Sequence, residues 1–272
     1  MYFELKSSFK DAVKTDIEAL RKGALRIKNG FKPMNEALSR MEDNALCHDM
    51  AKGREVIDEI LTAPPEQLRR RAYLLQLLKR FGCIYQGWEL YGAFQEYISA
   101  SNFGLLQIPT EYVDFLLLCI EREPASFIEI GVMYGGFATF TSAVLSRFNA
   151  ELEYHCVDIE DNFRDWDHYA QRLPLRKQVS MTSADFCGRA FDVVFIDGDH
   201  SYHGMKRDFM NLGRYARLCG FHDIHGTEYD HLDGGTRRCW NDLRLSYRER
   251  QRVTEITHMN EQWMGIGVIE FQ

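Results

Sequence analysis

Residues 127–136 read FIEIGVMYGG, and an apolar, alanine-rich segment, FATFTSAVLSRF, follows at once. The first four residues are apolar apart from Glu129, which is typical of a buried strand. Gly131, Gly135 and Gly136 then indicate a tight turn, because glycine is favoured where the chain reverses sharply or its backbone approaches a ligand closely. The alanine-rich segment predicts a helix that would direct its unpaired N–H groups at whatever binds over the turn.

The spacing of the three glycines distinguishes this turn from two phosphate-binding turns. A dinucleotide-binding fingerprint has the pattern G-x-G-x-x-G, whereas this turn has G-x-x-x-G-G, preceded by Glu129. The sequence also contains no G-x-x-x-x-G-K-[ST], the pattern of a P-loop. The pattern [DE]-x-G-x-x-x-G-G resembles motif I of the class I S-adenosylmethionine-dependent methyltransferases. A glycine-rich turn in another kind of α/β protein is the alternative.

Strand-like and helix-like segments alternate after residue 107, which predicts a mostly parallel sheet with helices on both faces. A helix to about Glu121, with Thr110 as its N-cap, should precede the first strand. The strands are expected near 126–131, 152–158, 178–183, 191–197, 219–224, 252–258 and 263–271, and the later helices up to 148 and over 161–173, 203–216 and 235–248. Because only the short link MNEQ joins the last two strands, they should form an antiparallel hairpin. The predicted fold class is therefore α/β, with a Rossmann-like seven-stranded, mostly parallel sheet, a C-terminal antiparallel hairpin and an α-helical N-terminal extension.

The chain divides into two predicted regions. Residues 1–104 contain little glycine or proline and show helical spacing in four blocks, 9–27, 34–61, 65–81 and 87–99. This helical N-terminal extension would serve as a lid or as an oligomer contact, through which the protein would form a homo-oligomer. Residues 105–272 make up the predicted methyltransferase domain.

The composition argues against several classes of function. Apolar residues make up 45% and charged residues 27% of the chain, as in ordinary soluble proteins. The formal net charge of −7 argues against a nucleic-acid partner, which requires a basic surface. The apolar runs are too short to cross a bilayer and the N-terminus lacks the apolar core of a signal peptide, so we expect a cytoplasmic protein without a membrane partner. The seven cysteines form no C-x-x-C pair, which indicates reduced thiols instead of disulfides or a zinc site.

Four segments sharpen the resemblance to the methyltransferases. In chain order they are EIGVMYGG (129–136), VDIED (157–161), FDVVFIDGDHSYHGMKRDF (191–209) and FHDIHG (221–226). Together they resemble the class I branch that contains metal-dependent sugar and macrolide O-methyltransferases and cephalosporin-hydroxylase-like proteins. The resemblance covers the chain from about Gln107 to the C-terminus. It implies that S-adenosylmethionine is the cofactor.

The acids at the carboxyl ends of the strands are the first candidate ligands, because open α/β sheets bind ligands at these ends. Asp158 ends the second strand, and its carboxylate can accept the hydroxyl protons of a ribose or, alternatively, cap a helix. The resemblance implies that Asp185 accepts from the adenine amino group with Phe186 beside the ring, and a turn aspartate is the alternative. The candidate cofactor-binding residues are Glu129, Gly131, Tyr134, Gly135, Gly136, Asp158, Asp185, Phe186 and Asp197.

The resemblance also implies the catalytic residues. A sulfonium methyl group is already activated, so the enzyme must chiefly align an acceptor oxygen and remove its proton. His200 occupies the position of the general base, and an imidazole that titrates near neutral pH suits this role. Asp197 and Asp223 would hold a divalent metal, magnesium or manganese, that lowers the pKa of the acceptor and orients it. Glu129, Asp158, Asp197 and Asp223 should therefore surround one hollow above the glycine turn.

His222 departs from the branch, whose metal-binding members usually have a carboxylate at this position. Magnesium prefers oxygen ligands, whereas imidazole suits manganese, iron or zinc better. Three alternatives stay open: two carboxylates and water hold the metal, a softer ion binds with His222 as a further ligand beside Asp197 and Asp223, or the site holds no metal.

The sequence therefore predicts an S-adenosylmethionine-dependent methyltransferase that acts on a hydroxyl group of a small polar molecule, such as a sugar or another natural product. A catalytically silent cofactor-binding protein retained for assembly is one alternative, although the presence of Asp197, His200 and Asp223 together weighs against it. A NAD-dependent oxidoreductase is the other alternative, which the glycine spacing disfavours.

Overall fold

The structure is a computed structural model that describes residues 50–83, 105–258 and 264–271. All of these residues belong to one compact unit of the chain. None of the helices in the described ranges is long and apolar enough to cross a membrane.

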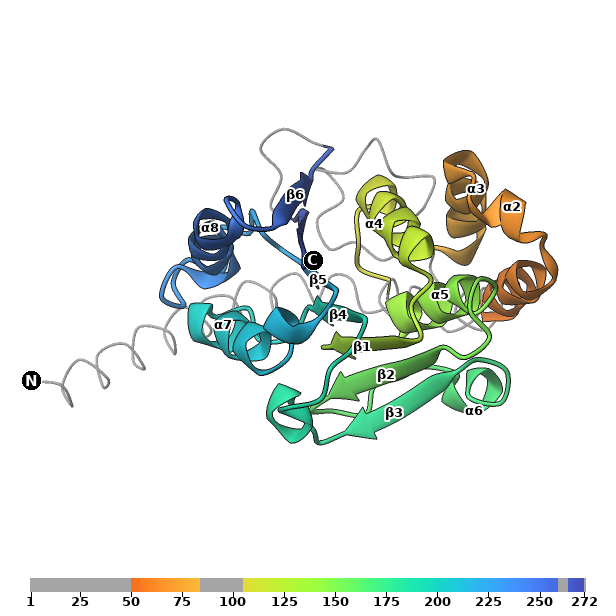
Figure 1. The fold of residues 1–272 in the computed structure, drawn as a ribbon. Helices are drawn as coiled ribbons and strands as arrows, with labels where there is room; N and C mark the ends of the chain where they lie inside the picture. Colours follow the sequence, from red (N-terminus) through yellow and green to blue (C-terminus); the bar gives the residue numbers. More distant parts are fainter. Residues whose placement is uncertain (1–49, 84–104, 259–263, 272) are drawn as a thin grey trace, which may run out of the picture. The chain divides into compact units, whose positions relative to one another are not determined.

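A seven-stranded sheet lies at the centre of this unit, with the strand order β3-β2-β1-β4-β5-β7-β6 (Figure 1). The first five strands are parallel, whereas β7 runs antiparallel to both β5 and β6. The order reverses between β1 and β4, which is the point where open α/β sheets bind ligands. The α/β fold class and the C-terminal antiparallel hairpin are thus confirmed. The strands are β1 (Ser126–Ile130), β2 (Glu153–Asp158), β3 (Leu175–Val179), β4 (Val193–Ile196), β5 (Leu218–Phe221), β6 (Arg252–Ile256) and β7 (Ile266–Glu270).

Side chains alternate between the two faces of the sheet, and each face has its own core. Phe127 belongs to the core that includes α4 (Pro109–Arg122) and α5 (Gly136–Leu145). Its neighbour Ile128 belongs to the opposite core, with α7 (Tyr202–Asn211) and α8 (Gly235–Tyr247). Aromatic rings fill the first core, where Phe137 of α5 stacks on Phe195 of β4 with ring centroids 4.4 Å apart. Because helices cover both faces of the sheet, a ligand can reach the sheet only at the ends of its strands.

The described part of the predicted N-terminal extension is helical. Residues 50–62 form a helix, and the predicted block 65–81 forms α2 (Pro65–Leu68) and α3 (Arg71–Phe81). Their apolar side chains join the core of α4 and α5, where Phe81 packs edge-on against Phe140 at 5.4 Å. The blocks 9–27 and 87–99 and the earlier part of 34–61 lie outside the described residues, and the domain boundary at residue 104 stays a prediction.

Some predicted element boundaries are wrong. The helix α4 begins at Pro109 with Ile108 as its N-cap, so Thr110 is not the cap, because proline is favoured at the first helical position. The strand β3 covers Leu175–Val179 instead of 178–183, since Ser180 adopts a left-handed φ of 58° that ends it. The helix expected over 161–173 is only the single turn α6 (Trp166–Tyr169). The link at residues 259–262 lies outside the described residues.

Gly131→Ala should destabilise the protein more than Gly188→Ala. Both glycines have a positive φ, 87° and 85°, so alanine is strained by about 1–2 kcal/mol at either position. Only at Gly131 would the added methyl group overlap the backbone of Asp197 and Gly198. This overlap should lower the free energy of unfolding by about a further 1–3 kcal/mol. Denaturant unfolding of the two variants measures the difference, and equal losses of stability would contradict the close approach of the two strand ends.

Candidate functional site

The turn after β1 is held by backbone hydrogen bonds to the neighbouring strand. The N–H of Gly131 donates to the carbonyl oxygen of Val157 at 2.9 Å. The carboxylate Oδ2 of Asp158, at the end of β2, accepts from the N–H groups of Val132 and Met133 at 2.8 and 2.9 Å. Asp158 therefore fixes the glycine turn directly.

A cavity of about 650 Å³ opens beside this turn, within the usual size range of small-molecule sites. Asp158 and Asp197, two of the predicted cofactor-binding residues, both line it. Ile130, Val157 and Ile159 supply apolar parts of its lining. A lining that combines carboxylates with apolar side chains suits a ligand that has both hydroxyl groups and a flat, apolar ring.

A second, smaller cavity of about 110 Å³ adjoins the first at the ends of β4 and β5. Its polar lining includes five predicted site residues: Glu129, Asp197, His200, His222 and Asp223. Three residues line both cavities: Gly131, Met133 and Asp197. The single hollow expected from the sequence is thus two cavities that meet at Asp197.

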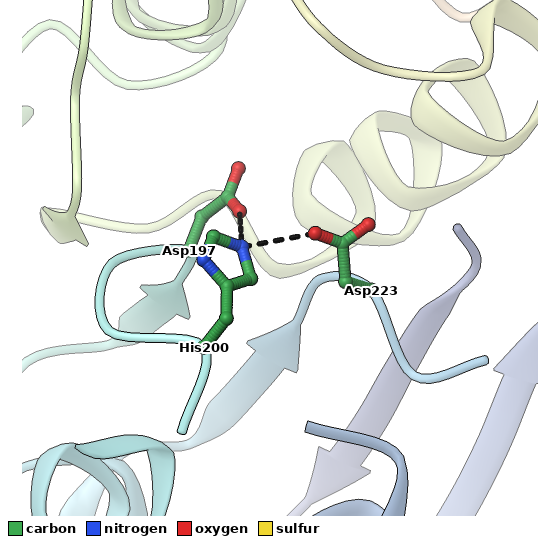
Figure 2. Close-up of side chains that lie close together, drawn as sticks. All are labelled: Asp197, His200 and Asp223. Carbon is green, nitrogen blue, oxygen red and sulfur yellow. Dashed lines mark ion pairs between the residues drawn. The ribbon is translucent and has the colours of Figure 1, made fainter. Parts of the chain in front are cut away.

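Two aspartates and two histidines come together in the smaller cavity. The Nε2 atom of His200 lies 2.9 Å from Oδ2 of Asp223 and 3.5 Å from Oδ1 of Asp197. The Nδ1 atom of His222 lies 3.0 Å from Oδ1 of Asp197 and 3.5 Å from Oδ1 of Asp223. Figure 2 shows Asp197 at the end of β4, His200 on the loop that follows and Asp223 after β5, with both carboxylates facing the same ring nitrogen of His200.

Opposite charges shift the pKa values within this cluster. Burial alone would lower the pKa of both imidazoles, but Asp197 and Asp223 raise the pKa of His200 to about 10 and that of His222 to about 9. Burial alone would raise the pKa of Asp197, but His222 and His200 lower it to about 2. In this arrangement both histidines are therefore imidazolium ions near neutral pH.

The cluster also contains a donor set for a metal ion. One donor atom from each of Asp197, His200 and Asp223 lies within 4.8 Å of the others. Oδ1 of Asp223 is buried and has no hydrogen-bond partner among the described residues, which is costly unless a cation or water satisfies it. The set contains His200 in place of the predicted His222, although His222 remains within 3.5 Å of both aspartates.

The backbone at Asp223 is strained and is held by α8. Asp223 has a φ of 55°, in the left-handed region that residues other than glycine rarely adopt. The hydroxyl of Thr236, in the first turn of α8, donates to the carbonyl oxygen of Asp223 at 2.7 Å. The N–H of Gly226 donates to the same oxygen at 3.0 Å. Such strain is typical of functional sites.

Glu129 lines the smaller cavity from β1 and is only 2% exposed. Its Oε2 atom accepts a hydrogen bond from the hydroxyl of Tyr154 at 2.6 Å. Burial raises the pKa of Glu129 well above its ordinary value despite this hydrogen bond, and the charges of Asp197 and Asp158 add to the shift. Desolvation therefore favours the neutral form of the Glu129 carboxyl group.

Two predicted adenine contacts, Asp185 and Phe186, do not line either cavity. They lie in the short 3-10 helix η2 (Ser183–Phe186), where Asp185 completes a capping box. Its Oδ2 atom accepts from the N–H of Thr182 at 2.8 Å. Phe186 is buried in the core, edge-on to Phe191. Local capping thus uses one oxygen, Oδ2, of the carboxylate that was expected to recognise adenine.

Three further predicted cofactor residues, Tyr134, Gly135 and Gly136, shape the turn and do not line the cavities. Gly135 is the N-cap of α5 and Gly136 its first residue. The ring of Phe163 packs so closely on Gly135 that a Cβ there would lie 2.6 Å from it. The guanidinium group of Arg164 lies over the ring of Tyr134, 3.9 Å from its centroid.

Two residues of the smaller cavity, Gln107 and Tyr229, were missed in the sequence. The amide Nε2 of Gln107 donates to Oδ2 of Asp197 at 3.1 Å. The ring of Tyr229 stacks on His200, with centroids 4.4 Å apart and an interplanar angle of 16°. A Cβ at Gly235 would lie 2.6 Å from the carbonyl oxygen of Tyr229. The Gly234-Gly235 pair in the sequence could therefore have indicated that another segment packs closely here.

Comparison with protein families matches residues 128–225 to a family described as a methyltransferase domain. Over these residues the chain carries a methyltransferase domain. The match covers the glycine turn, the aspartates Asp158 and Asp197 of the larger cavity, and the acid–imidazole cluster. The prediction of an S-adenosylmethionine-dependent methyltransferase is confirmed at this level.

Several solved methyltransferase structures are similar to this domain. The O-methyltransferase from Bacillus cereus in complex with SAH is 14% identical over 61% of this chain and 82% of that chain, with a TM-score of 0.48. The O-methyltransferase TomG from Streptomyces achromogenes in complex with SAM is 17% identical over 61% and 80%, with a TM-score of 0.46. The SAH-bound methyltransferase PaMTH1 from Podospora anserina is 12% identical over 61% and 80%, also with a TM-score of 0.46. No curated protein matches the sequence.

Replacing Tyr229 by Leu should remove a ring-current shift from the imidazole protons of His200. The near-parallel tyrosine ring at 4.4 Å shields these protons, and leucine has no ring current. NMR of histidine-labelled protein measures the shift, with the His200 signals assigned by their loss in His200→Gln. Tyr229→Phe is the matched control and should keep the wild-type shift, whereas an unchanged shift in Tyr229→Leu would contradict the stacking.

Proposed function

We propose that this protein transfers the methyl group of S-adenosylmethionine to a hydroxyl oxygen of a small polar acceptor, such as a sugar or another natural product. The meeting of the two cavities at Gly131 and Asp197 carries this proposal. A donor in the larger cavity would extend its reactive end towards the smaller one, where the acidic and basic groups lie. Holding both reactants in this way supplies much of the rate enhancement for an already activated methyl group.

The larger cavity suits the nucleoside part of the donor. The Asp158 carboxylate is an acceptor, as the two hydroxyl groups of a ribose require. Its Oδ2 atom binds the turn and its Oδ1 atom accepts only from the N–H of Glu160, at 3.1 Å, among the described residues. Since a carboxylate has about four acceptor positions, Asp158 can hold the turn and a ribose hydroxyl together.

His200 is proposed as the general base. While it is paired with Asp197 and Asp223 it carries a proton and cannot accept another. It must therefore lose that proton before the reaction. The neutral imidazole then takes the proton of the acceptor hydroxyl as the oxygen–carbon bond forms and the sulfur–carbon bond breaks, which leaves S-adenosylhomocysteine and a methyl ether.

A divalent metal fits the same residues and is the alternative to a free His200 base, because an imidazole nitrogen that binds a metal cannot also accept a proton. Asp197, His200 and Asp223 would hold it, and the buried Oδ1 of Asp223 would gain a partner. A bound cation would lower the pKa of the acceptor hydroxyl and orient it. Because the set contains an imidazole nitrogen, manganese or another softer ion fits better than magnesium.

A nicotinamide dinucleotide fits the turn less well. A dinucleotide site uses free N–H groups at the start of the helix to bind the pyrophosphate. Here the N–H groups of Val132 and Met133 already donate to Asp158, whose negative charge would repel a phosphate. A silent assembly protein also receives less support, because buried charge clusters are weak contributors to stability and are better explained by chemistry.

Asp158→Ala should weaken the binding of S-adenosylhomocysteine about 10- to 100-fold, because it removes a charged acceptor worth about 1.5–3 kcal/mol. Isothermal titration calorimetry measures the change, and thermal unfolding checks that the turn survives. Asp161→Ala is the matched control, since Asp161 pairs with Lys177 at 2.8 Å and does not line the larger cavity. If both variants bind S-adenosylhomocysteine as tightly as the wild type does, Asp158 does not bind the ribose.

Binding of Mn²⁺ should release at least one proton per ion near neutral pH, since a cation must displace the proton on His200. Calorimetric titrations in two buffers of different ionisation enthalpy count the released protons. Asp223→Asn should abolish binding, whereas Asp233→Asn, on the exposed loop nearby, should not. Binding without proton release would contradict His200 as a ligand, and absence of binding would contradict the metal site.

A further inference from the structure

Residues of α7 form part of the lining of the larger cavity. Asp208, near the end of this helix, lines the cavity together with Thr182 from the turn after β3. We propose that Asp208, and not Asp185, accepts a hydrogen bond from the 6-amino group of adenine and so makes the site specific for an adenine nucleoside. This inference rests on the proposed donor, S-adenosylmethionine.

The Asp208 carboxylate is fixed in place by its neighbours. The residue is 1% exposed, and its Oδ1 atom accepts from the hydroxyl of Ser183 at 2.6 Å and from Nε of Arg207 at 3.3 Å. Asn211, one turn further along α7, donates its amide to the oxygen of Ser183 at 2.9 Å. A carboxylate held this firmly can discriminate between ligand groups, because it cannot turn away from an unsuitable one.

The second oxygen of Asp208 is left for a ligand. Among the described residues, none donates a hydrogen bond to its Oδ2 atom. Burial raises the pKa of Asp208, and the Ser183 hydroxyl and Arg207 only partly offset this effect. A further donor would therefore stabilise the buried anion, and the amino group of a bound adenine is such a donor.

The competing residue, Asp185, uses one carboxylate oxygen for local capping and lies outside the cavity. Its Oδ2 atom accepts from both the N–H and the hydroxyl of Thr182, at 2.8 and 3.3 Å. These bonds form the capping box that begins η2, and Asp185 does not line the cavity. Its role is to hold Thr182 and Ser183 where they meet the cavity and Asp208.

A carboxylate distinguishes adenine from hypoxanthine by the direction of its hydrogen bonds. Adenine presents an amino donor at position 6, whereas hypoxanthine presents a carbonyl oxygen that only accepts. An ionised aspartate also only accepts, so the two oxygens would repel each other. An asparagine at the same place can turn its amide N–H towards the carbonyl and remove this penalty.

The test compares the affinities of S-adenosylhomocysteine and S-inosylhomocysteine by isothermal titration calorimetry. The wild type should prefer the adenosyl compound at least tenfold. Asp208→Asn should lose most of this preference, or invert it, whereas Asp185→Asn should keep it. A preference that survives in Asp208→Asn, or that is lost in Asp185→Asn, would overturn the assignment.

Two further results keep the test decisive. Equal affinities of the wild type for both compounds would overturn the inference without any variant, even if Asp208→Asn fails to fold. If the wild type binds neither compound, the proposed donor fails and the adenine assignment falls with it. Binding of S-adenosylhomocysteine without any role of Asp208 would leave the proposed function intact and reject only this inference.

Discussion

The close approach of the chain after β1 to the chain after β4 is the contact on which the site depends. At Gly131 a side chain of any kind would overlap the backbone of Asp197 and Gly198, so glycine there allows the two strand ends to touch. The same contact makes Asp197 a wall of both cavities. A donor bound in one cavity and an acceptor bound in the other would therefore meet beside Gly131 and Asp197. The backbone packing of two parallel strands thus sets the distance over which the methyl group would travel.

The charges around this contact are better explained by chemistry than by stability. Asp197, His200, His222 and Asp223 are buried or half-buried, and desolvation opposes the charged forms of Asp197, His200 and His222. Buried ion pairs of this kind are often no more stabilising than apolar residues of the same size. The left-handed backbone of Asp223, held by Thr236, adds a local cost. A role of the cluster in binding a metal ion or in transferring a proton would explain why the protein keeps these destabilising features.

The sequence was sufficient to predict the fold class and the residues at the strand ends. The glycine turn, Asp158, Asp197, His200 and Asp223 all follow buried strands, and the topology of a parallel sheet brings such residues to one edge. For Asp185 the sequence left two roles open, an adenine contact and a turn aspartate, and the capping box that the structure shows is the second of these. Tyr229 and Asp208 could not be found in this way, since one lies on an irregular loop and the other inside a helix. Their positions depend on tertiary packing, which the order of residues alone does not reveal.

A crystal structure of the protein with S-adenosylhomocysteine and Mn²⁺ would show whether the two cavities hold the two reactants. We expect the ribose at Asp158, the adenine at Asp208 and the sulfur at the junction beside Gly131 and Asp197, facing His200. A ligand bound elsewhere, or one whose sulfur faces away from the smaller cavity, would contradict methyl transfer at this site.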